Sequence, residues 1–228
     1  MRQIKNVFLL TLMLLTACGL ATPAATLQTI SVEYTGASIP WLAVVTNCAG
    51  GNVVDSQQIA ADFQDSQSFD LTIRIGHPEN LVSPAFQIGS EEILVIENPQ
   101  NQVKVLTAEQ VKKLFTGQIS NWKDLGGSDT SVQVWTFPPG EDIQQVFDKE
   151  ALGGSPLTSS ARLATSPDEM EKAIANDVNA VGVQPRRWKG SNVLDTFTTS
   201  TIPVLVLTKA DPQMNVQNVI ACLQNKVP

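Results

Sequence analysis

Apolar and polar residues alternate along several short segments of the chain, which is the pattern of half-buried β-strands. The period of two is clear in residues 28–35 and 69–75, and the second segment carries Leu71, Ile73 and Ile75 on one face. Residues 92–97 instead form an apolar run between two glutamates, which is typical of a strand buried on both faces. Further short strands are predicted at 52–55, 131–137, 180–184 and 203–207.

Helices are predicted between these strands, and two of them carry clear start signals. Thr107 is followed three residues later by Gln110, a capping box that opens a helix ending near residue 115. Ser166 precedes Pro167 and stands three residues before Glu169, so a second helix begins there and ends near residue 176. Strands and helices alternate without an internal repeat, which predicts an α/β fold with parallel sheets. The other predicted helices are 40–48, 142–152 and 214–224.

The N-terminus has the composition of an export signal. Arg2 and Lys5 precede an apolar stretch, residues 7–17, which is shorter than the about 20 residues that a membrane-spanning helix needs. The stretch ends in Leu-Thr-Ala before Cys18 and resembles the bacterial lipobox, in which the cysteine is diacylated. We therefore expect a signal peptide at 1–17, a tether at 18–26, and a protein anchored by lipid to the extracytoplasmic face of the bacterial membrane. The alternative is a plain secretory signal followed by an unmodified cysteine.

Export gives the two remaining cysteines an oxidising environment. Cys48 ends the first predicted helix, and Cys222 lies in the last one. If these two helices pack together, the cysteines form a disulfide; otherwise they are two separate buried thiols.

Composition excludes several classes of protein. Hydrophobic residues make up 43% of the 228 residues and charged residues 16%, which fits a globular domain and neither a disordered chain nor a coiled coil. The net charge of −7, without a basic cluster, argues against nucleic-acid binding. One histidine and three cysteines without a C-x-x-C pair argue against a zinc site. Neither a nucleophile elbow nor a Walker loop is present, so we predict no enzyme and no cofactor.

The middle of the chain carries the most specific motifs. Asn98-Pro99-Gln100-Asn101 is followed by Phe115-Thr116-Gly117, Asn121-Trp122 and Leu125-Gly126-Gly127. Together with the segments 36–40, 169–183 and 203–207, in this order, these motifs resemble the phosphate-binding periplasmic proteins of ABC uptake systems. The resemblance covers residues 28–226. The residues of the central motif suit structure more than ligand binding, because glycine permits positive φ angles and tryptophan fills a core.

The resemblance implies a type II periplasmic-binding-protein fold: two α/β lobes with parallel-rich sheets, joined by a two-strand hinge, with the solute between them. Lobe one would comprise residues 26–95 and 186–228, and lobe two residues 96–185. The chain is shorter than usual between residues 40 and 69, where the family carries a serine-rich ligand turn that we do not find.

The anion-binding turn of the family departs from its pattern here. The family places an Arg, a Gly and a Ser-Gly-Thr turn at a helix start, which suits oxyanions. Gly140 is kept, but Phe137 replaces the Arg, and Glu141, Asp142 and Ile143 replace the Ser-Gly-Thr. At about 4 Å, like charges repel by about 4 kcal/mol at an effective dielectric constant of about 20, so a dianion is disfavoured. The acids either lie in solvent or face the cleft and favour a cationic or zwitterionic ligand.

The first lobe offers groups of the opposite character. Arg74 sits inside a predicted strand, and His77 follows the end of that strand. Ser38 and the N–H of Ile39 lie at the first strand-to-helix turn. Ligands of open α/β sheets bind at such carboxyl ends of strands. The alternatives are that Arg74 pairs with an acid such as Asp70 and that His77 is a surface loop residue. Arg186 and Arg187 follow a strand, where they either form hinge ion pairs or reach the cleft.

These observations lead to one main hypothesis, an extracytoplasmic solute-binding lipoprotein that acts as a monomer with an ABC permease. Its ligand would be phosphate or another small anionic or zwitterionic molecule. The alternative is a sensory or scaffolding lipoprotein that keeps the fold without transport. The predicted ligand-binding residues are Ser38, Ile39, Arg74, His77, Gly140, Glu141 and Asp142.

Overall fold

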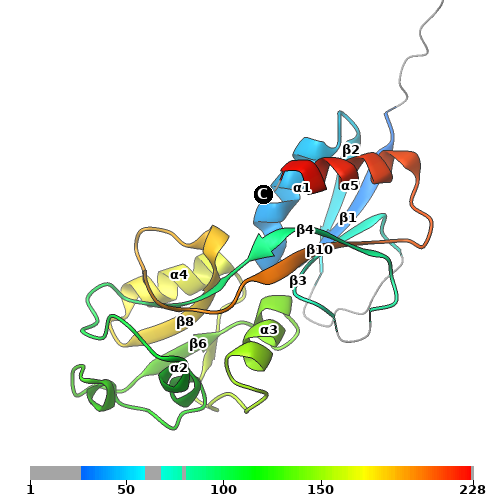
Figure 1. Cartoon of the computed structure of the whole chain (residues 1–228). Helices are drawn as coiled ribbons and strands as arrows, with labels where there is room; N and C mark the ends of the chain where they lie inside the picture. Colours follow the sequence, from blue (N-terminus) through cyan, green and yellow to red (C-terminus); the bar gives the residue numbers. More distant parts are fainter. Residues whose placement is uncertain (1–26, 60–67, 79–80, 227–228) are drawn as a thin grey trace, which may run out of the picture.

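The computed structural model of the protein describes residues 27–59, 68–78 and 81–226. It contains two five-stranded sheets with helices packed on them, which form two lobes (Figure 1). The α/β two-lobe fold implied by the sequence is confirmed. The expected signal peptide, the tether and Cys18 lie outside the described residues.

Lobe one is built on a sheet with the strand order β2-β1-β3-β10-β4. Strand β1 pairs in parallel with β2 and β3, whereas β10 runs antiparallel between β3 and β4. Helices α1 and α5 lie side by side on this lobe (Figure 1). The elements are β1 (Thr29–Tyr34), η1 (Gly36–Ser38), α1 (Ile39–Cys48), β2 (Val53–Gln58), β3 (Leu71–Ile75), β4 (Ala85–Glu91), β10 (Ile202–Thr208) and α5 (Met214–Lys226).

Lobe two has the strand order β7-β6-β8-β5-β9. Strand β6 pairs in parallel with β7 and β8, and β5 runs antiparallel to β8 and β9. Both sheets are therefore mixed rather than mainly parallel. The elements are β5 (Ile93–Glu97), α2 (Ala108–Phe115), η2 (Trp122–Leu125), β6 (Gln133–Thr136), α3 (Asp142–Glu150), β7 (Arg162–Leu163), α4 (Pro167–Asn176), β8 (Ala180–Pro185), η3 (Arg186–Trp188) and β9 (Leu194–Thr198).

The chain passes between the lobes twice. The first passage is at Glu92, between β4 and β5, and the second is at residues 199–201, between β9 and β10. The sequence placed residues 186–228 in lobe one, but β9 pairs with β5 in the second sheet. The second boundary therefore lies after β9, and the first lies three residues earlier than expected.

Local sequence signals form the elements that they predicted. Thr107 and Gln110 form the expected capping box at α2, and the Ser166 side chain accepts from Glu169 N–H at α4. In the central motif, Trp122 is buried and donates from Nε1 to the carbonyl oxygen of Asn179 at 2.9 Å. These contacts are consistent with the structural role expected for this motif.

A disulfide joins α1 to α5. Of the two possibilities for the cysteines, the structure has the bridge: the Cα atoms of Cys48 and Cys222 are 5.7 Å apart. The bridge links residues separated by 174 positions, so the loop that it closes contains all of lobe two.

Candidate functional site

The start of α3 lies against lobe one, where it forms the seam between the lobes. Residues 137–140 form a turn with two prolines after β6, and Glu141 N–H donates to the carbonyl oxygen of Pro138 at 3.0 Å. The first turn of α3 then packs near β3 (Figure 1), and its Asp142 bonds Thr35, the residue before η1. The two acids at the helix start therefore face the other lobe and not solvent.

Asp142 connects the lobes through direct hydrogen bonds. Its side chain is 2% exposed, and its Oδ2 accepts from the backbone N–H of Ile75 at 2.8 Å. The hydroxyl of Thr35 donates to the same carboxylate, with distances of 3.1 and 3.2 Å to its two oxygens. Burial raises the pKa of Asp142, while the Arg74 charge and these hydrogen bonds act in the opposite direction.

Glu141 lies over the first turn of lobe one. Its side chain is 7% exposed, and a Cβ atom added at Gly36 would lie 3.6 Å from its Oε1. Burial, followed by the charge of Asp142, raises the pKa of Glu141 to about 7. The nearby backbone N–H groups of Ala37 and Gly36, and the charge of Arg74, act in the opposite direction on this pKa.

Arg74 is the positive charge beside these acids. It is buried in β3, and its charge lowers the pKa of both Glu141 and Asp142 against the effect of burial. Asp70, the acid considered as its alternative partner, instead binds the Ser31 hydroxyl at 2.8 Å and Lys209 Nζ at 3.0 Å. Arg74 therefore belongs to the seam.

The hydroxyl of Thr35 faces the other lobe, whereas that of Ser38, the predicted residue, turns back on its own backbone. The Ser38 hydroxyl is fully buried, accepts from Thr35 N–H at 2.9 Å and donates to the Thr35 carbonyl oxygen at 3.0 Å. It thus stabilises the turn before α1, which begins at Ile39. Thr35 was missed as a candidate, although it directly follows β1, where the carboxyl end of a strand could have indicated it.

A small cavity of about 70 Å³ lies at the seam. Two of its basic side chains, Arg74 and the exposed His77, come from lobe one, and the third, Lys149, comes from α3. Since a single water molecule needs about 10–15 Å³ of such space, the cavity has room for a small group. Its complete lining is Arg74, Ile75, His77, Pro78, Asp142, Gln145, Val146 and Lys149.

Two residues of the turn before α3 do not line this cavity. Gly140 is half-buried, and its carbonyl oxygen accepts from Gln145 Nε2 at 3.2 Å. Phe137, which replaces the Arg of the family pattern, packs its side chain in the hydrophobic core. Its backbone N–H donates to Gln144 Oε1, which ties the turn to α3.

The arginines after β8 form ion pairs at the hinge. Arg186 pairs with Glu92, at the first passage between the lobes. Arg187 lies 3.6 Å from the carboxylate of Glu91 and 4.1 Å from the ring centroid of Trp41. These contacts assign both arginines to the hinge rather than to the cavity.

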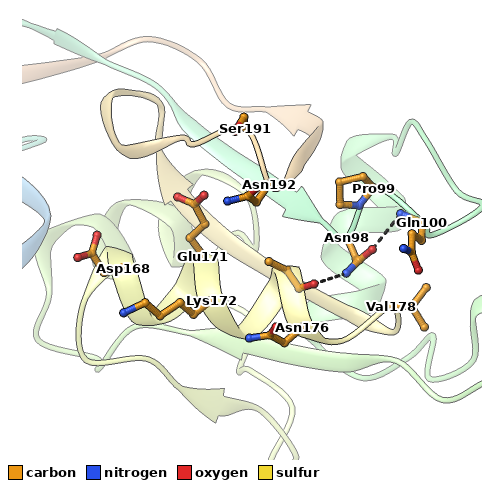
Figure 2. A pocket seen from close by; sticks show the side chains of 11 residues that line it. Asn98, Pro99, Gln100, Asp168, Glu171, Lys172, Asn176, Val178, Ser191 and Asn192 are labelled. Atoms are coloured by element: carbon orange, nitrogen blue, oxygen red, sulfur yellow. Dashed lines mark hydrogen bonds between the residues drawn. The ribbon is translucent and has the colours of Figure 1, made fainter.

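A larger hollow, about 980 Å³ in volume, lies along α4 on lobe two (Figure 2). Its lining is polar, and none of the predicted ligand-binding residues contributes to it. The Asn98 side chain there donates to the carbonyl oxygens of Ile174 and Ala175, at 3.1 and 2.8 Å, so it fixes the end of α4. We therefore place the candidate site at the seam.

The described ranges contain neither a candidate membrane span nor a candidate metal cluster. Residues 27–59, 68–78 and 81–226 contain no helix that is long and apolar enough to cross a membrane. The same ranges contain no cluster of three or more His, Cys, Asp or Glu side chains suited to a metal ion.

Solved structures with the same fold include two from phosphate transport systems. A phosphate ABC transporter substrate-binding protein from Clostridium perfringens, solved with bound phosphate, superposes with a TM-score of 0.77 at 18% identity, covering 86% of this chain and 93% of that one. A phosphate transport receptor from Vibrio cholerae superposes with a TM-score of 0.68 at 18% identity, covering 86% and 94%.

Sequence comparison agrees with this fold. The phosphate-binding protein PstS of Bacillus subtilis is 34% identical over 85 residues, which is 37% of this chain and 28% of that protein. The model of the PBP superfamily domain matches residues 84–225, more than half of the chain. The resemblance inferred from the motifs is confirmed, and the chain belongs to the PBP superfamily.

Proposed function

We propose that the chain is an extracytoplasmic solute-binding lipoprotein, the monomeric substrate-binding component of an ABC uptake transporter, and that its solute is a small oxyanion. The observation that carries the proposal is the seam cavity, where Arg74, His77 and Lys149 converge from both lobes. A fold with two lobes favours a solute site between them. Similar proteins from phosphate transport support an anion as the solute.

The acids at the seam restrict the charge of this solute. Asp142 lines the cavity, and Glu141 lies next to it in sequence. A dianion about 4 Å from an ionised carboxylate would meet a repulsion of several kcal/mol at an effective dielectric constant of about 20, twice that of a monoanion. The solute is therefore a singly charged oxyanion, and the doubly protonated phosphate monoanion is preferred to the singly protonated dianion.

Binding is testable by thermal shift and calorimetry with phosphate, arsenate, sulfate, nitrate and acetate at pH 6 and pH 8. A bound oxyanion at 100 times its dissociation constant should add about 2.7 kcal/mol of stability, and phosphate should bind more tightly at pH 6.

Variants of the cavity lining locate the site. Lys149→Ala and His77→Ala change exposed side chains, and each should weaken binding about tenfold by removing a hydrogen-bond donor to the anion. Lys172→Ala, at an exposed position on α4, is the matched control and should bind as the unaltered protein does. Equal affinities in all three variants would refute the seam as the binding site.

A second candidate function is favoured by the direct bonds from Asp142 to Thr35 and Ile75. These bonds join the lobes directly, which suits a sensory or scaffolding lipoprotein. The two functions differ in their partners: a transport component binds an oxyanion and co-purifies with a permease, whereas a scaffold does neither.

Lipid attachment through Cys18 is part of the proposal, and its test is independent of the ligand. Cys18→Ser should abolish incorporation of a labelled fatty acid and release the protein from the membrane fraction, since no thiol remains for acylation. Membrane-bound, labelled protein in this variant would contradict the lipobox interpretation.

A further inference from the structure

The first turn of lobe one presents donors that suit an oxyanion. They are the Thr35 hydroxyl, the N–H groups of Gly36 and Ala37, and the N–H of Ile75 at the end of β3, with Arg74 as the nearby charge. Backbone N–H groups at a helix start and an arginine are the usual partners of anions.

These donors are occupied by lobe two itself. Asp142 accepts from Thr35 and Ile75, and the buried Glu141 carboxylate lies over Gly36, where an added Cβ atom would be 3.6 Å from Glu141 Oε1. We propose that Glu141 and Asp142 act as an intramolecular anion, an acid latch that occupies the donor turn of lobe one and holds the lobes closed without a solute. This inference deepens the proposed function. It rests on that function in one respect, because it assumes that the lobes must open to admit the solute.

The packing around the latch requires the two lobes to approach closely. Gly76, with φ of +88°, lies where an added Cβ atom would be 2.4 Å from Val146 Cγ2 of α3. A further direct bond joins η3 to the same turn, since Trp188 Nε1 donates to the Ala37 carbonyl oxygen at 3.1 Å. The absence of a side chain at Gly76 therefore lets α3 bring its acids to the donors.

The latch has a consequence for affinity. A solute that needs the donor turn must first displace two carboxylates of the same chain. Its apparent dissociation constant is then the intrinsic constant divided by the fraction of molecules in which the latch is open. The unaltered protein should bind oxyanions more weakly than a variant in which the latch is removed.

The test uses Asp142→Asn in the full chain, in buffer free of oxyanions. Asparagine keeps the shape but removes the charge, so the variant should show a larger radius of gyration by X-ray scattering. It should also show about tenfold faster hydrogen exchange at the Ile75 amide, because a charge-assisted bond is lost. The matched control is Asp148→Asn on the same helix, whose carboxylate accepts from Gln144 of α3 at 2.8 Å. Unchanged scattering and exchange in Asp142→Asn would overturn the latch.

Thr35→Val changes the other side of the contact and keeps the test decisive if Asp142→Asn folds poorly. In the double variant Thr35→Val/Asp142→Asn, the Thr35→Val change should add little to the faster Ile75 exchange that Asp142→Asn already causes. Additive effects of the two changes would show that Thr35 and Asp142 act separately.

The outcomes for latch and function are distinguishable. If Asp142→Asn opens the lobes but neither protein binds any oxyanion, the latch stands and the proposed function fails. If the unaltered protein binds phosphate and the variant neither opens nor binds more tightly, the latch fails and the proposed function stands.

Discussion

Replacing both Cys48 and Cys222 by alanine is expected to lower the free energy of unfolding by about 2–5 kcal/mol. The bridge joins positions 174 residues apart, and a cross-link stabilises by restricting the unfolded chain, more so for longer loops. It also fixes α5, the last helix of the chain, to α1 on lobe one. Urea unfolding of the variant, followed by circular dichroism, measures the loss.

The control for this prediction is chemical. The unaltered protein treated with a reductant should unfold at the same urea concentration as the double alanine variant, and the reductant should not affect the variant. If the oxidised protein and the variant share one unfolding midpoint, the bridge does not stabilise the fold.

Stability should also rise as the pH falls from 8 to 5, with Glu97 as one source. Glu97 is fully buried at the end of β5, and burial raises its pKa to about 7, against the effects of the Thr196 hydroxyl and the Lys104 charge. In the unfolded chain the pKa is near the ordinary value of 4.5. Between these two pKa values the folded protein holds more protons than the unfolded chain. The contribution of Glu97 to stability is therefore fully present below the unfolded pKa and is lost as the pH rises through about 7.

Glu97→Gln should therefore stabilise the protein at pH 8 by about 3 kcal/mol and change little at pH 4.5, since each pKa unit corresponds to about 1.4 kcal/mol. Glutamine keeps the shape of a protonated glutamate and never has to ionise. Some pH dependence should remain, because Glu141 is also raised to about 7. Urea unfolding across this pH range measures the effect, and Glu109→Gln, at an exposed position on α2, is the control. A variant whose stability follows that of the unaltered protein at every pH would contradict the assignment.

Local signals in the sequence predicted local structure well. The capping residues Thr107 and Ser166 act on groups within one helical turn, so neighbouring residues determine the result. Strand β9 was assigned to the wrong lobe because its pairing with β5 joins Leu94 to Thr198 across the second lobe. Such a long-range register leaves no mark in either segment alone.

Only part of the candidate site could be predicted, because its residues come from segments that are far apart in the sequence. Arg74 and His77 were found because they stand at the end of a strand, where open sheets bind ligands. Lys149 was missed, although Asp142, Gln145 and Lys149 recur at helical spacing on one face of α3. Which face of α3 meets lobe one depends on the hinge, and no periodicity within the helix indicates it.

The central claim is that a small oxyanion binds between the lobes beside Arg74. The most direct measurement is a crystal structure of the protein with arsenate at pH 6, in which the arsenic is located by its anomalous scattering. We expect an arsenic position within the seam, with arsenate oxygens in contact with Arg74 and Lys149. Arsenic found only on outer surfaces or at lattice contacts, with the seam unoccupied, would contradict it.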